Sequence, residues 1–408
     1  MHKDLIQGTK GEKDNIIAEL RDLAANYCKL GDYKEALKIN QKVYDLRCRF
    51  LGAEHIDTLS ALHELAFCYR ECGKYDAAVD GFEEAYRLRC EILGENHPDT
   101  LASLRDLAFT YGEAGEYGKS FELNQKVYDS CREILGVSHP DTLIAIGNLA
   151  TAYYNLGDFD RALEYDIEVY NARREILGEE HIDTLSALNN LALAYLDCGQ
   201  REKSLELFEK CRKTDVKVLG EKHPDTLTAF HNSAQAYCAA GQYDEALELN
   251  QKVYDLRREV LGEEHPCTLA SLNNLAFTLI KLGEFDKALE LRERSYRLHC
   301  KVLGEEHPYT IKALGNSASA YRAVGKFSEA LGLHKKAYDL HSKVLGEEHP
   351  DTLISLANLA LNHRCVGDLV KSLELYKKLY KLRRKVLGET HPSTIKTLNI
   401  IEDLERRI

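Results

Sequence analysis

The sequence predicts an all-α solenoid of nine consecutive helix-turn-helix repeats, each 42 residues long. Compared with itself at an offset of 42, the chain aligns nine copies of one string without insertion or deletion. The copies run from LGAEHIDTL at 51–59 to LGETHPSTI at 387–395, and a glycine recurs in a second register at 31, 73, 115, 157, 199, 241, 283, 325 and 367. Because repetition at a fixed period overrides the length prior, we expect one repeat array rather than several globular domains.

Each repeat contains two amphipathic segments. In the second repeat, an apolar stripe at positions i, i+3, i+4 and i+7 predicts a first helix, helix A, over residues 59–70. Its members are Leu62, Leu65, Ala66 and Tyr69. Gly73 then supplies a left-handed turn, and a second apolar stripe predicts helix B over residues 75–93.

The ends of these helices carry recognisable signals. Asp32 is expected to cap the first helix B, and Glu35 three residues later is expected to complete a capping box. Pro98, Pro140 and Pro224 fit the first turn of the following helix A, where the missing N–H is harmless.

A period of 42 is also compatible with HEAT or armadillo units, so the side chains must decide. The residues of one repeat resemble the tetratricopeptide signature in order and spacing, with eight extra residues that lengthen helix B and its exit loop. The matching residues are Leu65, Ala66, Tyr69, Gly73, Tyr75 and Ala78. The longer unit, with its NNLA and VLGEEHP strings, is similar to the repeats of kinesin light chains and nephrocystin-type proteins. The resemblance implies a right-handed superhelical solenoid and is weak for function, because a fold does not determine a task.

We expect three segments along the chain. Residues 1–15 form a polar N-terminal segment, 16–393 form nine repeats of one solenoid domain, and 394–408 form a C-terminal capping helix. Glu402 stands where other repeats carry alanine at an inner position, which is typical of a polar cap. These ends predict a complete array rather than a fragment.

Composition excludes several classes of protein. The chain has a formal net charge of −12 and lacks a basic stripe, which argues against nucleic acid as a partner, although residues 367–408 carry a local net charge of +4. It has neither a long apolar run nor a signal segment, so we expect no membrane partner and a cytoplasmic location. Twelve cysteines form no CxxC pair and are expected to be reduced, with neither metal nor cofactor bound.

The most informative position lies on helix A, immediately before the packed Leu-Ala pair. It is acidic in the first three repeats, as Asp22, Glu64 and Asp106, and is asparagine in the next six. These are Asn148, Asn190, Asn232, Asn274, Asn316 and Asn358. An amide offers both a donor and an acceptor and can therefore bind peptide backbone of any sequence.

By resemblance, this stripe of helix A lines the concave face, and its asparagines contact the backbone of a bound segment. The alternative is that they bond to neighbouring helices and keep the stack in register. One turn along, Leu193 and Phe277 are candidates to hold apolar ligand side chains, with helix packing as an equally good explanation. Arg322 and Arg364 flank the amides and predict a preference for an acidic or carboxylate-bearing segment.

Features that suggest catalysis have simpler explanations. One histidine per repeat, at 55, 97, 139, 181, 223, 265, 307, 349 and 391, is expected to cap the next helix A. The tyrosines at one helix B position are expected to pack between helices with the hydroxyl at the rim. No constellation of a known active site is present, so we do not expect an enzyme or a small-molecule substrate.

The sequence thus predicts a non-enzymatic scaffold that binds a peptide or protein segment in the concave groove. The alternative is a regulatory or sensor subunit of an enzyme assembly, such as a protease or nucleotide-dependent switch, with catalysis supplied in trans. Self-assembly through the end repeats is a third possibility.

Overall fold

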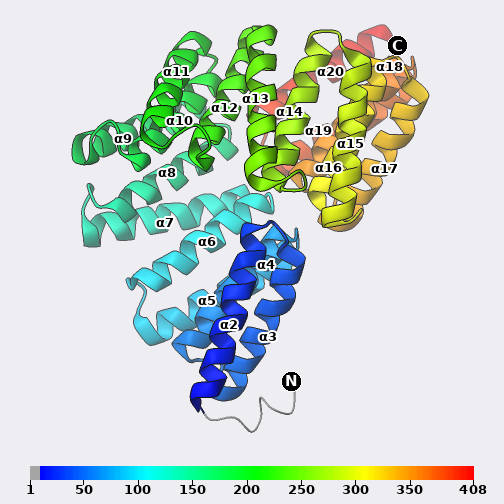
Figure 1. Cartoon of the computed structure of the whole chain (residues 1–408). Helices are drawn as coiled ribbons and strands as arrows, with labels where there is room; N and C mark the ends of the chain where they lie inside the picture. The colour runs from blue at the N-terminus through cyan, green and yellow to red at the C-terminus, as the bar shows by residue number, and fades with distance from the viewer. Residues whose placement is uncertain (1–9) are drawn as a thin grey trace. The chain divides into compact units, whose positions relative to one another are not determined.

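The computed structural model describes residues 10–408, which form nineteen helices and no strand (Figure 1). Helices of type A are α2 (Lys10–Lys29), α4 (Ile56–Glu71), α6 (Pro98–Glu113), α8 (Pro140–Asn155), α10 (Ile182–Asp197), α12 (Pro224–Ala240), α14 (Pro266–Lys281), α16 (Pro308–Ala323), α18 (Pro350–Cys365) and α20 (Pro392–Arg407). Helices of type B are α3 (Tyr33–Leu51), α5 (Tyr75–Leu93), α7 (Tyr117–Leu135), α9 (Phe159–Leu177), α11 (Arg201–Val218), α13 (Tyr243–Leu261), α15 (Phe285–Leu303), α17 (Phe327–Leu345) and α19 (Leu369–Leu387). The predicted all-α fold of alternating helices is confirmed.

The chain divides into two compact units, one holding residues up to 114 with 122–130, the other holding 115–121 with 131–408. Each helix packs against the next from α2 to α6 in the first unit and from α8 to α20 in the second. In the second unit each A helix from α10 to α16 also contacts the next A helix. These A helices therefore present one continuous row, as expected where each repeat is stabilised by its neighbours.

The N-terminal polar segment expected at 1–15 lies outside the described residues as far as residue 9, and helix α2 already begins at Lys10. None of the helices α2–α20 combines the length and the apolar character that a membrane-spanning segment requires.

The nine repeated histidines are helix caps, as predicted. In every case the imidazole Nδ1 accepts a hydrogen bond from the backbone N–H two residues later, at 3.1–3.3 Å. All seven prolines of the chain occupy the first position of the helix that follows such a histidine. The LGxxHP string therefore ends one helix and begins the next: Gly94, for example, adopts φ 90°, and His97 caps α6.

The capping box predicted for the first helix B is half correct. Asp32 accepts a hydrogen bond from the Glu35 backbone N–H at 3.2 Å. The Glu35 carboxylate does not return the bond, because the Asp32 N–H already donates to the Tyr27 carbonyl, and Glu35 pairs with Lys38 instead.

In several repeats an arginine of helix B forms hydrogen bonds to the next helix A. Arg89 donates from Nη1 to the Asp99 carbonyl at 3.0 Å and to Ser103 Oγ at 2.7 Å. The buried Arg257 and the half-buried Arg383 repeat this arrangement with the carbonyl ten residues later and the hydroxyl fourteen residues later. Each such side chain sets the separation and rotation of two consecutive helices.

Ion pairs between the exit loops and the following helix B connect neighbouring repeats. The first loop carboxylate pairs with a cation 31 residues later, as in Glu263 with Arg294 at 2.6 Å and Glu347 with Lys378 at 2.7 Å. Three of these lysines also bond the hydroxyl of the repeated helix B tyrosine: Lys126 to Tyr86, Lys210 to Tyr170 and Lys378 to Tyr338. In these three tyrosines the hydroxyl lies at the rim, as predicted, whereas the Tyr254 hydroxyl is buried.

The second loop carboxylate pairs with a lysine 37 residues later, as in Glu306 with Lys343 at 2.6 Å. One repeat carries the same pair with the charges exchanged. There Lys222 occupies the carboxylate position, Glu259 occupies the lysine position, and the two side chains are 2.5 Å apart. The chain has thus changed both members of one pair while retaining the attraction between them.

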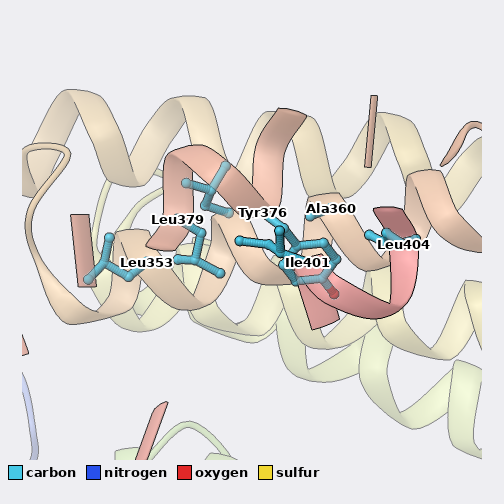
Figure 2. Packing of buried hydrophobic residues seen from close by; sticks show 7 residues of the cluster. Leu353, Ala360, Tyr376, Leu379, Ile401 and Leu404 are labelled. Atoms are coloured by element: carbon cyan, nitrogen blue, oxygen red, sulfur yellow. The ribbon is translucent and has the colours of Figure 1, made fainter. Parts of the chain in front are cut away.

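The last repeat is closed by α20, as Figure 2 shows. The cluster joins α18, α19 and α20 through Leu353, Ala360, Tyr376, Leu379, Ile401 and Leu404, all buried. Glu402 of α20 is exposed, although its equivalents Ala66 and Ala360 are fully buried. The cap role of α20 stays a prediction.

We predict that Lys222→Glu lowers the urea midpoint of unfolding, because two carboxylates then face each other across neighbouring repeats. The loss is expected to be about 0.5–1 kcal/mol, since the pair is exposed to solvent. Adding Glu259→Lys restores the attraction and is expected to return the midpoint close to that of the native protein. Failure of the double variant to recover would show that the pair does not connect the repeats.

Candidate functional site

Two of the six repeated asparagines bond to the preceding A helix. Asn232 Nδ2 donates to Asn189 Oδ1 at 3.2 Å, and Asn274 Nδ2 lies 3.1 Å from His231 Nε2. In each pair the partner lies 43 residues before the asparagine. Asp106, at the same position of an earlier repeat, pairs at 2.9 Å with His63, which also lies 43 residues before it. The register role considered as the alternative therefore accounts for Asn232 and Asn274.

The other four asparagines have no hydrogen-bond partner for the side-chain amide among residues 10–408. They are Asn148, Asn190, Asn316 and Asn358; Asn190 is exposed and the other three are partly exposed. Their donors and acceptors remain available for an external segment.

Three consecutive A helices converge on a cavity of about 380 Å³, which we call the A-helix pocket. Its residues are Ala150, Thr151 and Tyr154 of α8, Phe159, Ala162 and Asp166 of α9, Asn190, Leu193, Ala194, Leu196 and Asp197 of α10, and Gln235 of α12. The structure thus brings the predicted residues Asn190 and Leu193 together. The volume lies within the range of about 300–1,000 Å³ typical of ligand pockets.

Two aspartates that the sequence analysis did not identify also line the A-helix pocket. Burial raises the pKa of Asp166 to about 7 and raises the pKa of Asp197 above its ordinary value. Burial also raises the pKa of Tyr154, with the charge of Asp197 acting in the same direction. Neither carboxylate forms a hydrogen bond or an ion pair within the part of the chain that the structure describes.

The missing partner of Asp166 follows from the repeat geometry. At the equivalent position Asn40 donates to Cys68 Sγ at 3.2 Å, and Asn250 donates to Thr278 Oγ1 at 3.0 Å, each to the residue 28 positions later. In this repeat the residue 28 positions later is Ala194, which has no polar side-chain atom. A comparison of this helix B position with its partner across all repeats would have revealed the unpaired carboxylate.

Phe277, Arg322 and Arg364 belong to later repeats and do not line the A-helix pocket, and neither does Asn148 of α8. Phe277 is 43% exposed, with the Lys281 ammonium 5.3 Å from its ring centre. Burial lowers the pKa of Arg322, whose Nη1 is buried and unpaired. Arg364 and Arg322 both act on Tyr376, where their charges oppose the effect of burial on the pKa of the phenol. No carboxylate pairs with Arg322 or Arg364 between residues 10 and 408.

We predict that Asp166→Asn raises the free energy of unfolding at pH 8 and changes it little at pH 4. Since burial raises the carboxyl pKa from 3.8 to about 7, the native state binds more protons than the unfolded state between these values. Native stability therefore falls as the pH rises through that window. The neutral amide removes this loss, which is roughly 1–4 kcal/mol.

Urea denaturation of both proteins at each pH measures the difference. Asp286→Asn, an exposed change of the same charge in α15, is the matched control and should show no such pH dependence. A destabilisation by Asp166→Asn at pH 8 would contradict the prediction.

Comparison with known proteins gives one family. The tetratricopeptide repeat model matches eight times, at residues 16–91, 57–133, 107–175, 141–215, 183–259, 225–301, 267–342 and 309–385. A comparison with curated protein sequences finds no match.

Solved structures also resemble this chain, and those with a TM-score above 0.5 have the same fold. A protein of Podosopora anserina, described as a kinesin light chain with nearly identical TPR-like repeats, is 33% identical, covering 50% of this chain and 97% of its own, at a TM-score of 0.45. A Rap protein in complex with competence and sporulation factor is 12% identical over 91% of this chain and 99% of its own, at a TM-score of 0.60. The quorum sensor NprR from B. thuringiensis, in its apo form, is 16% identical over 88% of this chain and 98% of its own, at a TM-score of 0.55.

Proposed function

The chain belongs to the tetratricopeptide repeat family, and we propose that it is an adaptor that holds a peptide segment of a partner protein along the A helices α8–α18. At the coarser level, the repeats make the chain a protein-interaction scaffold. The proposal adds the place of binding and the form of the ligand, an extended or helical segment.

The observation that carries the proposal is the A-helix pocket. It combines the unpaired amide of Asn190 with the apolar side chain of Leu193, at a point where three A helices meet. Such a site can bond the backbone of a segment and enclose one of its side chains. Asn148, Asn316 and Asn358 continue the unpaired amides along the same row of helices, and Phe277 adds an exposed aromatic surface.

A structure of the same fold has been solved with a peptide bound. The Rap conjugation gene regulator of plasmid pLS20 is in complex with the Phr* peptide, at 12% identity and a TM-score of 0.56 over 91% of this chain. At this identity the likeness concerns the fold, and peptide binding is a property of that protein. It illustrates what a solenoid of this kind can do, and it supports testing peptides first.

We predict that Asn190→Ala, Asn316→Ala and Asn358→Ala together weaken peptide binding at least about tenfold, since each lost hydrogen bond contributes about 0.5–1.5 kcal/mol. The probes are peptides of about twelve residues selected from a random phage-displayed library on the full chain, long enough to extend along roughly four repeats. Fluorescence anisotropy gives the dissociation constants.

Asn232→Ala and Asn274→Ala serve as controls, because these amides bond to neighbouring A helices. They are expected to lower the melting temperature more than the affinity. Unchanged binding by the triple variant would remove the asparagines from the proposed site. Recovery of one stoichiometric enzyme in a pull-down, with no binding of short peptides, would favour the regulatory-subunit alternative instead.

We predict that Arg322 and Arg364 recognise a carboxylate of the bound segment. Two cations without a paired carboxylate gain more from an anionic partner than from a neutral one, because burial weakens the competing interaction with water. The double change Arg322→Gln and Arg364→Gln should therefore weaken the binding of glutamate-containing peptides about tenfold. The binding of peptides with glutamine in place of glutamate should hardly change. Arg201→Gln, on the exposed start of α11, controls for the change in charge. Equal losses for both kinds of peptide would disprove the assignment.

A further inference from the structure

Asp166 places a half-buried carboxylate in the A-helix pocket, and none of the residues 10–408 forms a hydrogen bond or an ion pair with it. Removing a carboxylate from water without a compensating bond costs free energy. Such a group is therefore expected mainly where a ligand or a partner protein supplies the missing bond. Asp197, which is exposed, adds a second carboxylate to the same cavity, on a different helix. The pocket therefore contains up to two negative charges and no positive one.

The rest of the lining is suited to a long side chain with a charged end. Leu193, Leu196 and the Phe159 ring provide apolar contact, and Tyr154 adds an aromatic ring with a hydroxyl. Methylene groups of lysine or arginine pack against such surfaces while the cation reaches a polar partner. Asn190 and Gln235 complete the lining with amides that can bond the backbone from which the side chain extends.

Neither a nearby arginine nor a metal-binding cluster explains the unpaired carboxylates. Arg161 lines the adjoining cavity, together with Asp197, but its guanidinium lies 3.5 Å from Asp158 and 3.5 Å from the Tyr153 hydroxyl. Burial is the cause of the raised pKa at both Asp166 and Asp197, and neither carboxylate forms an ion pair with a cation of residues 10–408. No cluster of three or more potential metal ligands occurs within residues 10–408.

We propose that the A-helix pocket binds the side chain of a lysine or arginine in the bound segment, with its cation between Asp166 and Asp197. The proposal rests on the proposed function, since it names a residue class within the segment that the A helices hold. The attraction is stronger than on an exposed surface because the pocket is partly shielded from water. An anionic side chain would be repelled, and an apolar one would leave the carboxylates unpaired.

The test uses the full chain and the selected peptides of about twelve residues described above. Each lysine in a binding peptide is replaced by norleucine and each arginine by citrulline, which remove the charge and retain most of the shape. At one position the replacement should weaken binding to the native protein at least about tenfold. With the variant Asp166→Asn and Asp197→Asn, the same replacement should change binding less than about twofold.

The variant Asp244→Asn and Asp286→Asn removes the same charge from exposed positions of α13 and α15 and should behave as the native protein does. Melting curves confirm folding, and Asp166→Asn is expected to retain it because an amide fits better than an unpaired carboxylate.

Three outcomes would overturn the inference, each in a different way. The cation site is wrong, while the proposed function stands, if peptides bind but tolerate neutral replacement at every lysine and arginine. The same holds if the replacement weakens binding equally in the Asp166→Asn and Asp197→Asn variant and in the Asp244→Asn and Asp286→Asn variant. If arginine amide alone binds as tightly as a whole peptide, the pocket takes a free small cation. If no peptide binds at all, the proposed function fails and this inference fails with it.

Discussion

The structure depends on one repeated constraint, the junction at which helix B ends and the next helix A begins. At that junction a glycine with positive φ turns the chain, a histidine caps the new helix, and a buried arginine such as Arg89 or Arg257 bonds across it. Loop carboxylates then pair with cations of the following helix B. Because these contacts recur at constant sequence separations, equivalent residues of different repeats meet equivalent neighbours, and each repeat can be compared directly with the others.

This regularity explains which features the sequence alone could predict. The caps formed by the nine histidines depend only on residues two positions apart, and the helix boundaries depend on local glycine and proline, so a single repeat is enough to infer them. The exposure of Glu402 likewise followed from its difference from the alanines of other repeats. Each of these signals is local or is visible in one alignment column.

The site was harder to predict because it depends on pairs of positions. The six asparagines look equivalent in the sequence, yet Asn232 and Asn274 are occupied by neighbours that precede them by 43 residues, and Asn190 is not. At the helix B position of Asp166, Asn40 and Asn250 bond to the residue 28 positions later, and in the repeat of Asp166 that residue is Ala194, which has no polar side-chain atom. Neither fact appears in a single column; both require knowledge of which positions touch, which the structure supplies.

Departures from the repeat pattern can then be sorted by whether a neighbour compensates for them. Lys222 departs from the usual loop carboxylate, but Glu259 departs in the opposite sense at the contacting position, so the ion pair and its structural role persist. Asp166 departs from the usual asparagine or aromatic residue, and its contacting position offers nothing in return. A compensated change is explained by the stability of the stack alone. An uncompensated charge at a pocket lowers that stability, so its explanation must come from outside the chain, and a cation of a bound segment is the partner that restores the balance.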